Sequence, residues 1–117
     1  MSTLALRYEM ARSAFERGDH LEAARTLEDL LADLSGEEVL HGTSELRLLL
    51  ARAYYHSAQL KRAERMLDAL VADEPSDPYV RLLLARTLQR QSRHDEARPH
   101  VAIAEALGAD TSSARRS

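Results

Sequence analysis

The string Arg-Leu-Leu-Leu-Ala-Arg occurs at Arg47–Arg52 and again, one repeat unit later, at Arg81–Arg86. The agreement continues on both sides of the string when segment 44–77 is laid over segment 78–111. A period of roughly 20–50 residues within one chain indicates a structural unit that stacks on copies of itself. The sequence therefore predicts a repeat array.

Alanines recur at two fixed places in each unit, and the pairs are Ala51 with Ala63 and Ala85 with Ala97. A weaker first unit, 4–37, carries the same pair as Ala11 and Ala23, at a longer spacing from the second unit. Two antiparallel helices can approach closely where such small side chains meet, and the apolar face that each hairpin leaves uncovered is buried by stacking on the next unit. Each unit is therefore predicted to be a helical hairpin.

Local signals mark the ends of these helices. Gly18-Asp19 predicts a turn, Ser35-Gly36 and Gly108 can end helices, and Asp77-Pro78 combines a helix cap with proline at the first helical position. Pro99 lies inside the last helix, where we expect a late start or a kink. The predicted helices are 3–17, 20–34, 44–57, 60–73, 78–91 and 94–107.

The period of 34, with Leu50-Ala51, Tyr54, Ala63 and Pro75 at their spacing, resembles the tetratricopeptide repeat. The resemblance implies an all-α, right-handed superhelical array of three antiparallel helix-turn-helix repeats with six helices. One domain would cover 1–111, with repeats 4–37, 44–77 and 78–111, an inserted loop near 38–43 and a short polar tail at 112–117. The family's early aromatic is replaced by arginine at three positions, Arg7, Arg47 and Arg81, of which Arg81 can reach back to Asp77.

Composition excludes several classes of function. The chain has no cysteine, so disulfides, thiol catalysis and cysteine-based zinc sites are excluded. A net charge of −3 gives no general attraction to nucleic acid or anionic lipid. No apolar run is long enough for a membrane span, and the start of the chain lacks the layout of a secretion signal. With no catalytic or phosphate-binding motif either, we expect a cytoplasmic protein without enzymatic activity or cofactor, and the scarcity of lysine is typical of a bacterial genome rich in GC.

The resemblance also implies that the first helix of each unit lines a concave groove. The helical spacing i, i+4, i+7 and i+8 places each of the following sets on one face of its helix. The candidate groove residues are Tyr8, Arg12, Phe15 and Glu16 in the first unit, Leu48, Arg52, Tyr55 and His56 in the second, and Leu82, Arg86, Gln89 and Arg90 in the third.

Arg12, Arg52 and Arg86 share one repeat position and are expected to form a row over an apolar floor. Such a row suits an acidic, partly apolar peptide, because each guanidinium can bind a carboxylate through two hydrogen bonds. The alternative is that the arginines are neutralised by the protein itself. We expect this for Arg12, since Glu9 and Glu16 stand at the i−3 and i+4 positions of the same helix. For Arg52, Arg86 and Arg90 both interpretations remain open.

The five histidines do not have the spacing of a metal site. His20 and His94 occupy the same repeat position and are expected to be packing residues, and His56 faces the groove alone. His94 and His100 are separated by more than the i, i+4 spacing that places two ligands on one helical face. We therefore expect no bound metal.

Two hypotheses for function follow. The first is a module that binds a peptide or helix of another protein in the groove, with no nucleic acid or membrane as partner. The second is self-association through the terminal repeat or the inserted loop, where Ile103 and Val39-Leu40 offer apolar side chains. On the second helix of each unit, one position should face the following unit. It carries the apolar Leu31 and Val71 in the first two units and the polar Glu105 in the third, as expected where an array ends. The sequence leaves open a monomer or a weak homodimer.

Overall fold

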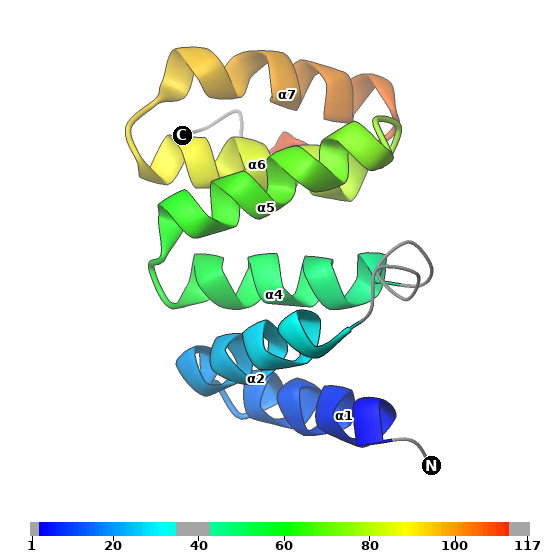
Figure 1. Ribbon diagram of the computed structural model, residues 1–117. Coiled ribbons are helices and arrows are strands. Elements are labelled where there is room, and N and C mark those ends of the chain that lie inside the picture. Colours follow the sequence, from blue (N-terminus) through cyan, green and yellow to red (C-terminus); the bar gives the residue numbers. More distant parts are fainter. Residues whose placement is uncertain (1–2, 35–42, 113–117) are drawn as a thin grey trace. The chain divides into compact units, whose positions relative to one another are not determined.

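The computed structural model describes residues 3–34 and 43–112, and within these ranges the regular structure is entirely helical (Figure 1). The six predicted helices are confirmed, each ending within one residue of its expected end. They are α1 (Thr3–Glu16), α2 (His20–Asp33), α4 (Ser44–His56), α5 (Leu60–Asp73), α6 (Pro78–Arg90) and α7 (His94–Ala106). The predicted stop at Ser35-Gly36 and the loop apolar pair Val39-Leu40 lie outside the described residues.

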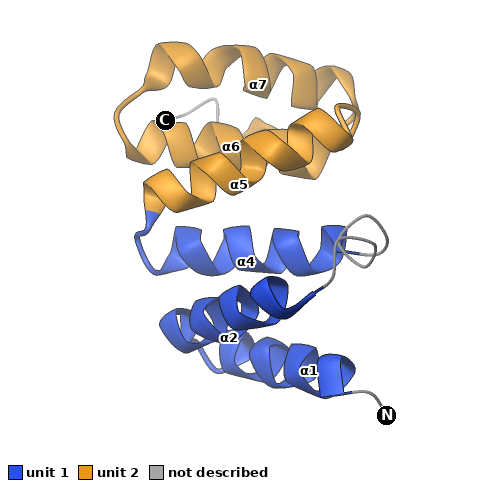
Figure 2. Ribbon diagram, viewed as in Figure 1, with its two compact units in different colours: residues 1–59 blue, residues 60–117 orange. Residues whose placement is uncertain are grey.

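The chain divides into two compact units (Figure 2). Unit 1 is Met1–Gln59 and contains α1, α2 and α4, whereas unit 2 is Leu60–Ser117 and contains α5, α6 and α7. The boundary falls in the turn that follows α4. The division of the chain into three sequence repeats stays a prediction.

In unit 1, α1 and α2 form a hairpin and α4 packs on α2. Ala11 and Ala23 are both completely buried, as expected for small residues at a close approach of two helices. Tyr54 of α4 is also buried, and its hydroxyl donates a hydrogen bond of 2.6 Å to the Glu28 carboxylate of α2. This bond satisfies the one polar atom that a buried tyrosine side chain carries.

Unit 2 also combines a hairpin, formed by α6 and α7, with a third helix, but this helix, α5, precedes the hairpin and packs on its first helix, α6. Ala85 and Ala97 are again completely buried. Thr87 is buried as well, and its hydroxyl donates to the carbonyl of Leu83, one turn earlier in α6. The polar atom of this core residue is therefore satisfied within its own helix.

The turns that follow α1, α4 and α6 share one backbone conformation. The second residue after the helix end has a positive φ in all three turns, at Gly18 (87°), Ala58 (61°) and Ser92 (61°), although only the first is a glycine. Gly108, at φ 100°, ends α7 in the same way. The predicted roles of Gly18 and Gly108 are thus confirmed, while the left-handed conformation of the other two was not anticipated.

Aspartate caps are present at two helix starts, of which only the one at Asp77 was predicted. The Asp19 carboxylate accepts a hydrogen bond from the amide of Glu22, and the Asp77 carboxylate accepts from the amides of Tyr79 and Val80. Each cap satisfies amide groups that have no partner inside the helix. Pro78 stands at the start of α6, as expected.

Of the two alternatives for Pro99, the late start of α7 is wrong, since the helix begins at His94 and contains Pro99, whose side chain is exposed and whose ring removes only one amide donor. The other alternative, a kink at Pro99, stays a prediction. A second expectation about unit 2 is also wrong. The Arg81 side chain does not bind Asp77. Its Nε donates to the Pro75 carbonyl, and its Nη1 lies 3.3 Å from Nδ1 of His100 on α7.

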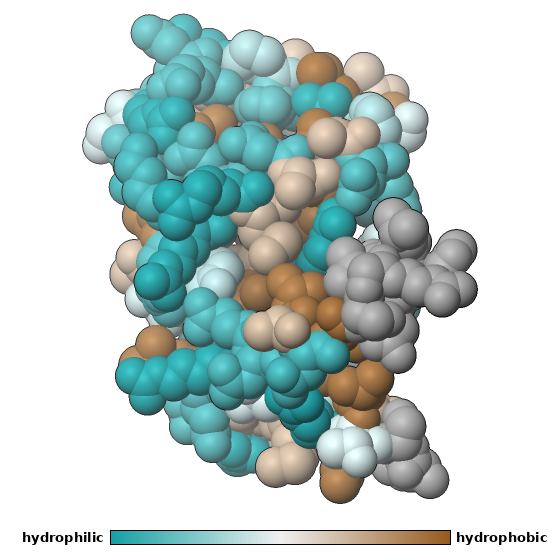
Figure 3. Space-filling model, in the orientation of Figure 1, coloured by the Kyte–Doolittle hydropathy of each residue, from teal (hydrophilic) through white to brown (hydrophobic). Residues whose placement is uncertain are grey.

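Figure 3 shows a face that is mostly hydrophilic, with hydrophobic side chains gathered in patches among the polar ones. Six large apolar residues of the described ranges are exposed: Leu6, Met10 and Leu21 in unit 1, and Tyr79, Ile103 and Leu107 in unit 2. Among the described residues, none of the helices has the length and apolar character needed to span a membrane.

Candidate functional site: an aromatic cluster with an arginine in unit 1

Helices α1 and α4 contact each other in unit 1 and bring together candidate residues from two sequence repeats. Phe15 and Tyr8 of α1 are half-buried, as are Leu48, Arg52 and Tyr55 of α4. Half-burial leaves part of each side chain open to a ligand while the rest is held by packing. The two helices thus supply aromatic, aliphatic and cationic groups to one region of unit 1.

Phe15 lies at the centre of an aromatic cluster, which we define as Phe15, His20, Tyr55 and His56. Its ring centroid is 4.7 Å from that of His20 and 5.7 Å from that of His56, and both contacts are edge-to-face. His20 and His56 are stacked, with centroids 4.7 Å apart and planes inclined by 26°. Tyr55 contacts His56 edge-on at 5.2 Å. Helices α1, α2 and α4 all contribute to this cluster.

Arg52 lies over the Phe15 ring, with its guanidinium carbon 4.6 Å from the ring centroid. This distance is typical of a cation–π interaction. Among the residues that the structure describes, Arg52 has no carboxylate within ion-pair distance and donates no hydrogen bond. The aromatic ring orients the guanidinium without using its N–H donors.

Arg12, at the same repeat position on α1, has a different environment. It contacts Glu9 at 3.4 Å and Glu16 at 3.8 Å, both on its own helix. The expectation that Arg12 is neutralised locally is therefore confirmed. Of the two arginines that unit 1 contributes to the predicted row, Arg52 is the one with donors available for another molecule.

Tyr8 adds a hydroxyl close to both arginines. Burial raises the pKa of this hydroxyl above its ordinary value of 10.0, and the negative charge of Glu45 acts in the same direction. The charges of Arg12 and Arg52 act against this rise in pKa. The Tyr8 side chain therefore stays a neutral phenol at physiological pH and can both donate and accept a hydrogen bond.

The third set of candidates lies on α6 in unit 2. Leu82, Arg86 and Gln89 are half-buried and Arg90 is exposed. They occupy one face of α6 at helical spacing, as expected. Their role as a binding surface stays a prediction.

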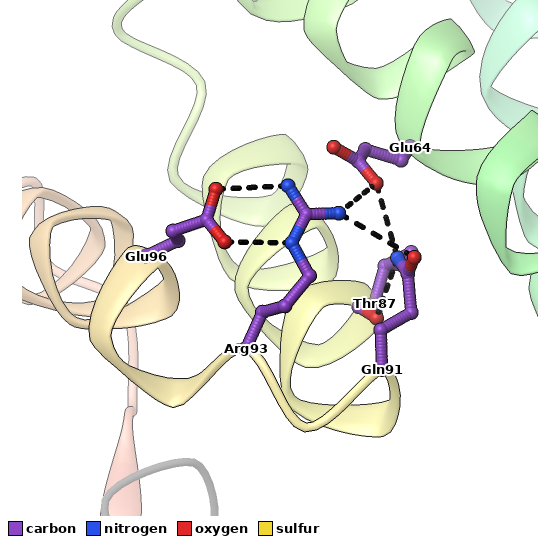
Figure 4. A network of polar contacts seen from close by, with 5 residues as sticks. All are labelled: Glu64, Thr87, Gln91, Arg93 and Glu96. Carbon is purple, nitrogen blue, oxygen red and sulfur yellow. Dashed lines mark hydrogen bonds and ion pairs between the residues drawn. The ribbon is translucent and has the colours of Figure 1, made fainter.

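A polar network in unit 2 was missed by the sequence reasoning (Figure 4). Arg93 donates to Glu96 through two hydrogen bonds, of 2.7 and 2.8 Å, and to Glu64 of α5 through one of 2.6 Å. Gln91 donates to the same Glu64 oxygen and to the carbonyl of Thr87. The i, i+3 spacing of Arg93 and Glu96 could have indicated one pair. The contact of Arg93 with Glu64 joins distant parts of the chain and has no local signal.

These contacts shift the pKa values of the groups involved. The hydrogen bond from Arg93 lowers the pKa of the Glu64 carboxyl, and the bond from Gln91 adds to this effect. Hydrogen bonding to Arg93 likewise lowers the pKa of Glu96, while the two carboxylates raise the pKa of Arg93. The network is a charged link between α5 and the start of α7 rather than a group with a pKa poised for acid–base catalysis.

The histidines are distributed differently from what the repeat positions indicated. His20 is a packing residue, as expected, but His94 is exposed because Gln89 takes the position of Phe15 in its unit. His56 is not alone, since it contacts three aromatic rings. Within the described ranges no group of three or more His, Asp or Glu side chains could hold a metal ion. His41 lies outside the described residues.

Several solved structures resemble the chain in fold. The complex of PcrH with the chaperone binding region of PopB gives a TM-score of 0.77 at 17% identity, over 92% of this chain and 83% of that one. The Yersinia enterocolitica type III secretion chaperone SycD with a peptide of the translocator YopD gives 0.76 at 19%, over 97% and 82%. MamA from Desulfovibrio magneticus RS-1 gives 0.77 at 18%, over 91% and 56%.

No curated protein matches the sequence. A profile of the family described as "Tetratricopeptide repeat" matches residues 14–86, which is more than half of the chain and includes both copies of the string, Arg47–Arg52 and Arg81–Arg86. The predicted repeat resemblance is confirmed by this match and by the helical neighbours. The chain belongs to the tetratricopeptide repeat family.

Proposed function

We propose that the protein is a protein-interaction module without catalytic activity, and that the surface of α1 and α4 in unit 1 binds a peptide or helix of another protein. The observation that carries the proposal is the position of Arg52 over the Phe15 ring with its N–H donors unused by the described residues. Buried charges in proteins are usually paired, so an oriented half-buried guanidinium suits a partner that supplies the anion.

The groups around Arg52 define the chemistry of the segment that would bind. A carboxylate on the partner would accept two hydrogen bonds from the guanidinium. Next to it, Leu48 and the exposed parts of Phe15 and Tyr55 would contact apolar side chains, and the Tyr8 hydroxyl would bind a backbone or side-chain polar group. The partner segment is therefore expected to combine an acidic residue with apolar neighbours.

The relatives in fold support this class of function. Two of them are chaperones solved with segments of the proteins that they bind, the chaperone binding region of PopB and a peptide of YopD. PopB is the partner of PcrH, and YopD is the partner of SycD. The two complexes support the proposal because in each of them a helical repeat protein of this fold holds a polypeptide segment.

The proposal is tested by affinity capture from a lysate of the source organism with three versions of the protein. Arg52→Glu reverses the charge over Phe15, and Arg25→Glu makes the same charge change at an exposed position on α2 of the same unit. We expect one or more proteins to be retained by the wild type and Arg25→Glu and lost with Arg52→Glu. If all three versions retain the same proteins, the α1 and α4 surface is not the binding site.

The Arg52→Glu variant must also be shown to fold. Circular dichroism and thermal melting should give wild-type helicity, with a modest decrease in stability from loss of the cation–π contact. Loss of partner capture with intact helicity assigns the effect to the surface itself.

A further inference from the structure

One face of α4 carries charges of opposite sign. Glu45, Leu48 and Arg52 stand at i, i+3 and i+7 of this helix, which places them on one side of it. Glu45 lies in the first turn of α4, and Arg52 lies in its second half, over the Phe15 ring of α1. With a rise of about 1.5 Å per residue, the two charged positions are about 10 Å apart along the helix axis.

The Glu45 carboxylate is available to another molecule. The residue is exposed, and within residues 3–34 and 43–112 its carboxylate accepts no hydrogen bond and forms no ion pair. Burial is the main cause that raises the pKa of the Tyr8 hydroxyl on α1, and the charge of Glu45 adds to this rise, whereas Arg12 and Arg52 oppose it. Tyr8 therefore lies near both ends of the row, and the two charges belong to one surface of unit 1.

An acidic residue in the first turn of a helix also interacts favourably with the helix dipole. This role accounts for a carboxylate near the start of α4, but it does not require any particular face of the helix. Glu22 has the same role in the first turn of α2 and is paired with Arg17 at 3.3 Å. Glu45 differs because its charge has no counterpart in the part of the chain that the structure describes.

We propose that this surface binds a helix of a partner in one direction, with an acidic side chain of the partner at Arg52, an apolar one at Leu48 and a basic one at Glu45. The inference rests on the proposed function and adds to it the second charge and the orientation of the bound segment. Arg52 alone would accept a carboxylate from a segment that runs either way. Two opposite charges select one direction, because the reversed segment brings like charges together.

The spacing of the row favours a helical partner over an extended one. In a helix, positions i and i+7 lie on one face about 10 Å apart, with i+3 and i+4 between them. In an extended segment, side chains on one face are about 7 Å or 14 Å apart, because successive side chains alternate between the two faces. A helix with acidic, apolar and basic residues at i, i+4 and i+7 therefore matches the row on α4.

Two synthetic peptides probe the surface. The first is an alanine-rich helix of about 20 residues, long enough to be helical in water, with glutamate at i, leucine at i+3 and i+4 and arginine at i+7. The second has the same composition but carries the arginine at i+5, away from that face. Each has a nitroxide spin label at its C-terminal end, beyond the arginine. NMR titration of the isotope-labelled protein measures Kd, and the label broadens the amide signals closest to it.

The first peptide should bind the wild type with its label at the start of α4, so the amide signals near Glu45 broaden and those near His56 stay sharp. Glu45→Gln should raise the Kd roughly two- to fivefold, as expected for the loss of one exposed ion pair. Glu22→Gln removes a carboxylate from the first turn of α2 and should leave the Kd unchanged. The second peptide should bind more weakly and should not respond to Glu45→Gln.

Exchange of the two charges gives the sharpest readout. The double variant of Glu45→Arg with Arg52→Glu keeps the net charge and reverses the row. The first peptide should therefore bind in the opposite direction, with broadened signals near His56 instead of near residue 45. A loss of stability alone cannot reverse a bound peptide. Circular dichroism should show wild-type helicity, and if the double variant does not fold, the effect of Glu45→Gln on Kd still decides.

Three results would overturn the inference. The wild type does not bind the first peptide, Glu45→Gln binds it as tightly as the wild type, or the double variant binds it in the unchanged direction. If the peptide is lost with Arg52→Glu but is insensitive to Glu45→Gln, the proposed function stands and only the second charge is wrong. Equal binding by the wild type and Arg52→Glu would contradict the proposed function itself, and the inference would fail with it.

Discussion

The guanidinium of Arg52 on α4 is held 4.6 Å above the ring of Phe15 on α1, which joins two sequence repeats through a cation and an aromatic face. The contact fixes a charged side chain without neutralising it. This distinguishes Arg52 from Arg12, which contacts two glutamates of its own helix. Repeat position alone would make the two arginines equivalent.

Replacement of Phe15 by leucine should remove the aromatic face under Arg52 and the edge contacts to His20 and His56, while keeping apolar bulk. We expect a loss of about 1 kcal/mol in the free energy of unfolding, since aromatic pairs and cation–π contacts each contribute on that order. Urea denaturation followed by circular dichroism measures the change. Wild-type stability of Phe15→Leu would show that the cluster adds nothing beyond apolar burial.

The backbone of the turns after α4 and α6 predicts stabilising substitutions. Ala58 and Ser92 both have a positive φ. This conformation costs L-residues energy, whereas glycine adopts it freely. Ala58→Gly and Ser92→Gly should each raise the free energy of unfolding by about 0.5–1 kcal/mol, despite the larger entropy of an unfolded glycine. Urea denaturation of each variant measures this change.

The reverse change at the matching position is the control. A Cβ at Gly18 would meet no atom within 4 Å, so its effect comes from the backbone alone. Gly18→Ala should lower stability by about 1 kcal/mol through backbone strain. The explanation by backbone strain requires that the free energy of unfolding rise with Ala58→Gly and Ser92→Gly and fall with Gly18→Ala. If glycine at residues 58 and 92 lowers stability, the turn conformation is not strained.

Glu64 predicts a dependence of stability on pH in the acidic range. The hydrogen bond from Arg93 lowers its pKa in the folded state below the ordinary 4.5, so the unfolded chain binds the proton more readily. The stabilisation is thus fully present above about pH 4.5 and is lost as pH falls through the folded pKa. Glu64→Gln should be less stable than the wild type at neutral pH and should lose less stability on acidification.

Urea denaturation at several values between roughly pH 3 and pH 7 tests this expectation, because that range spans the titration of carboxyl groups. Arg93→Gln should flatten the curve more strongly, because it also removes the two hydrogen bonds to Glu96. The double variant should add little to Arg93→Gln alone, since the contact between Arg93 and Glu64 is already lost there. If the free energy of unfolding varied with pH in parallel for the wild type and Glu64→Gln, the assignment of this pH dependence to Glu64 would be contradicted.

His100 predicts a second pH effect at higher pH. Burial lowers its pKa below the ordinary 6.5, and the positive charge of Arg81 adds to the effect while Asp68 opposes it. The unfolded chain therefore binds a proton at a pH where the folded chain does not, and stability should fall as pH decreases below about 6.5. His100→Gln keeps an acceptor for Arg81 without titrating, so its melting temperature should vary less between about pH 7 and pH 5.

The exposed His94 on the same helix provides the comparison, because His94→Gln removes a histidine that lacks the contact to Arg81. This variant should keep the pH dependence of the wild type. If the melting temperature varied with pH in the same way for the wild type, His100→Gln and His94→Gln, His100 would be excluded as the source of this pH dependence.

Most of the fold could be predicted because its signals are local or periodic. Gly18 and Asp77 act within one turn of the chain, and the buried pairs Ala51 with Ala63 and Ala85 with Ala97 recur at the repeat spacing. Periodicity is the signal that sequence reasoning detects best. The helix boundaries followed from the local signals at their ends.

The candidate site could be predicted only in part. The helical spacing placed Arg52 and His56 together on one face of their helix. It could not show that His20 from α2 stacks on His56 from α4. Repeat position also assigned the wrong environment to His94, because packing depends on neighbours in other helices. Contacts such as Arg81 with His100 join side chains with no common pattern in the sequence, so they require the three-dimensional structure.

The most direct test of the account is the affinity of the captured partner segment for the wild type, Arg52→Glu and Arg25→Glu, measured by isothermal titration calorimetry. If Arg52 binds a carboxylate of the partner, Arg52→Glu should raise Kd at least tenfold, about 1.4 kcal/mol, while Arg25→Glu leaves it within a small factor of the wild type. Equal Kd values for Arg52→Glu and the wild type would contradict the central claim that the arginine over Phe15 forms the binding site.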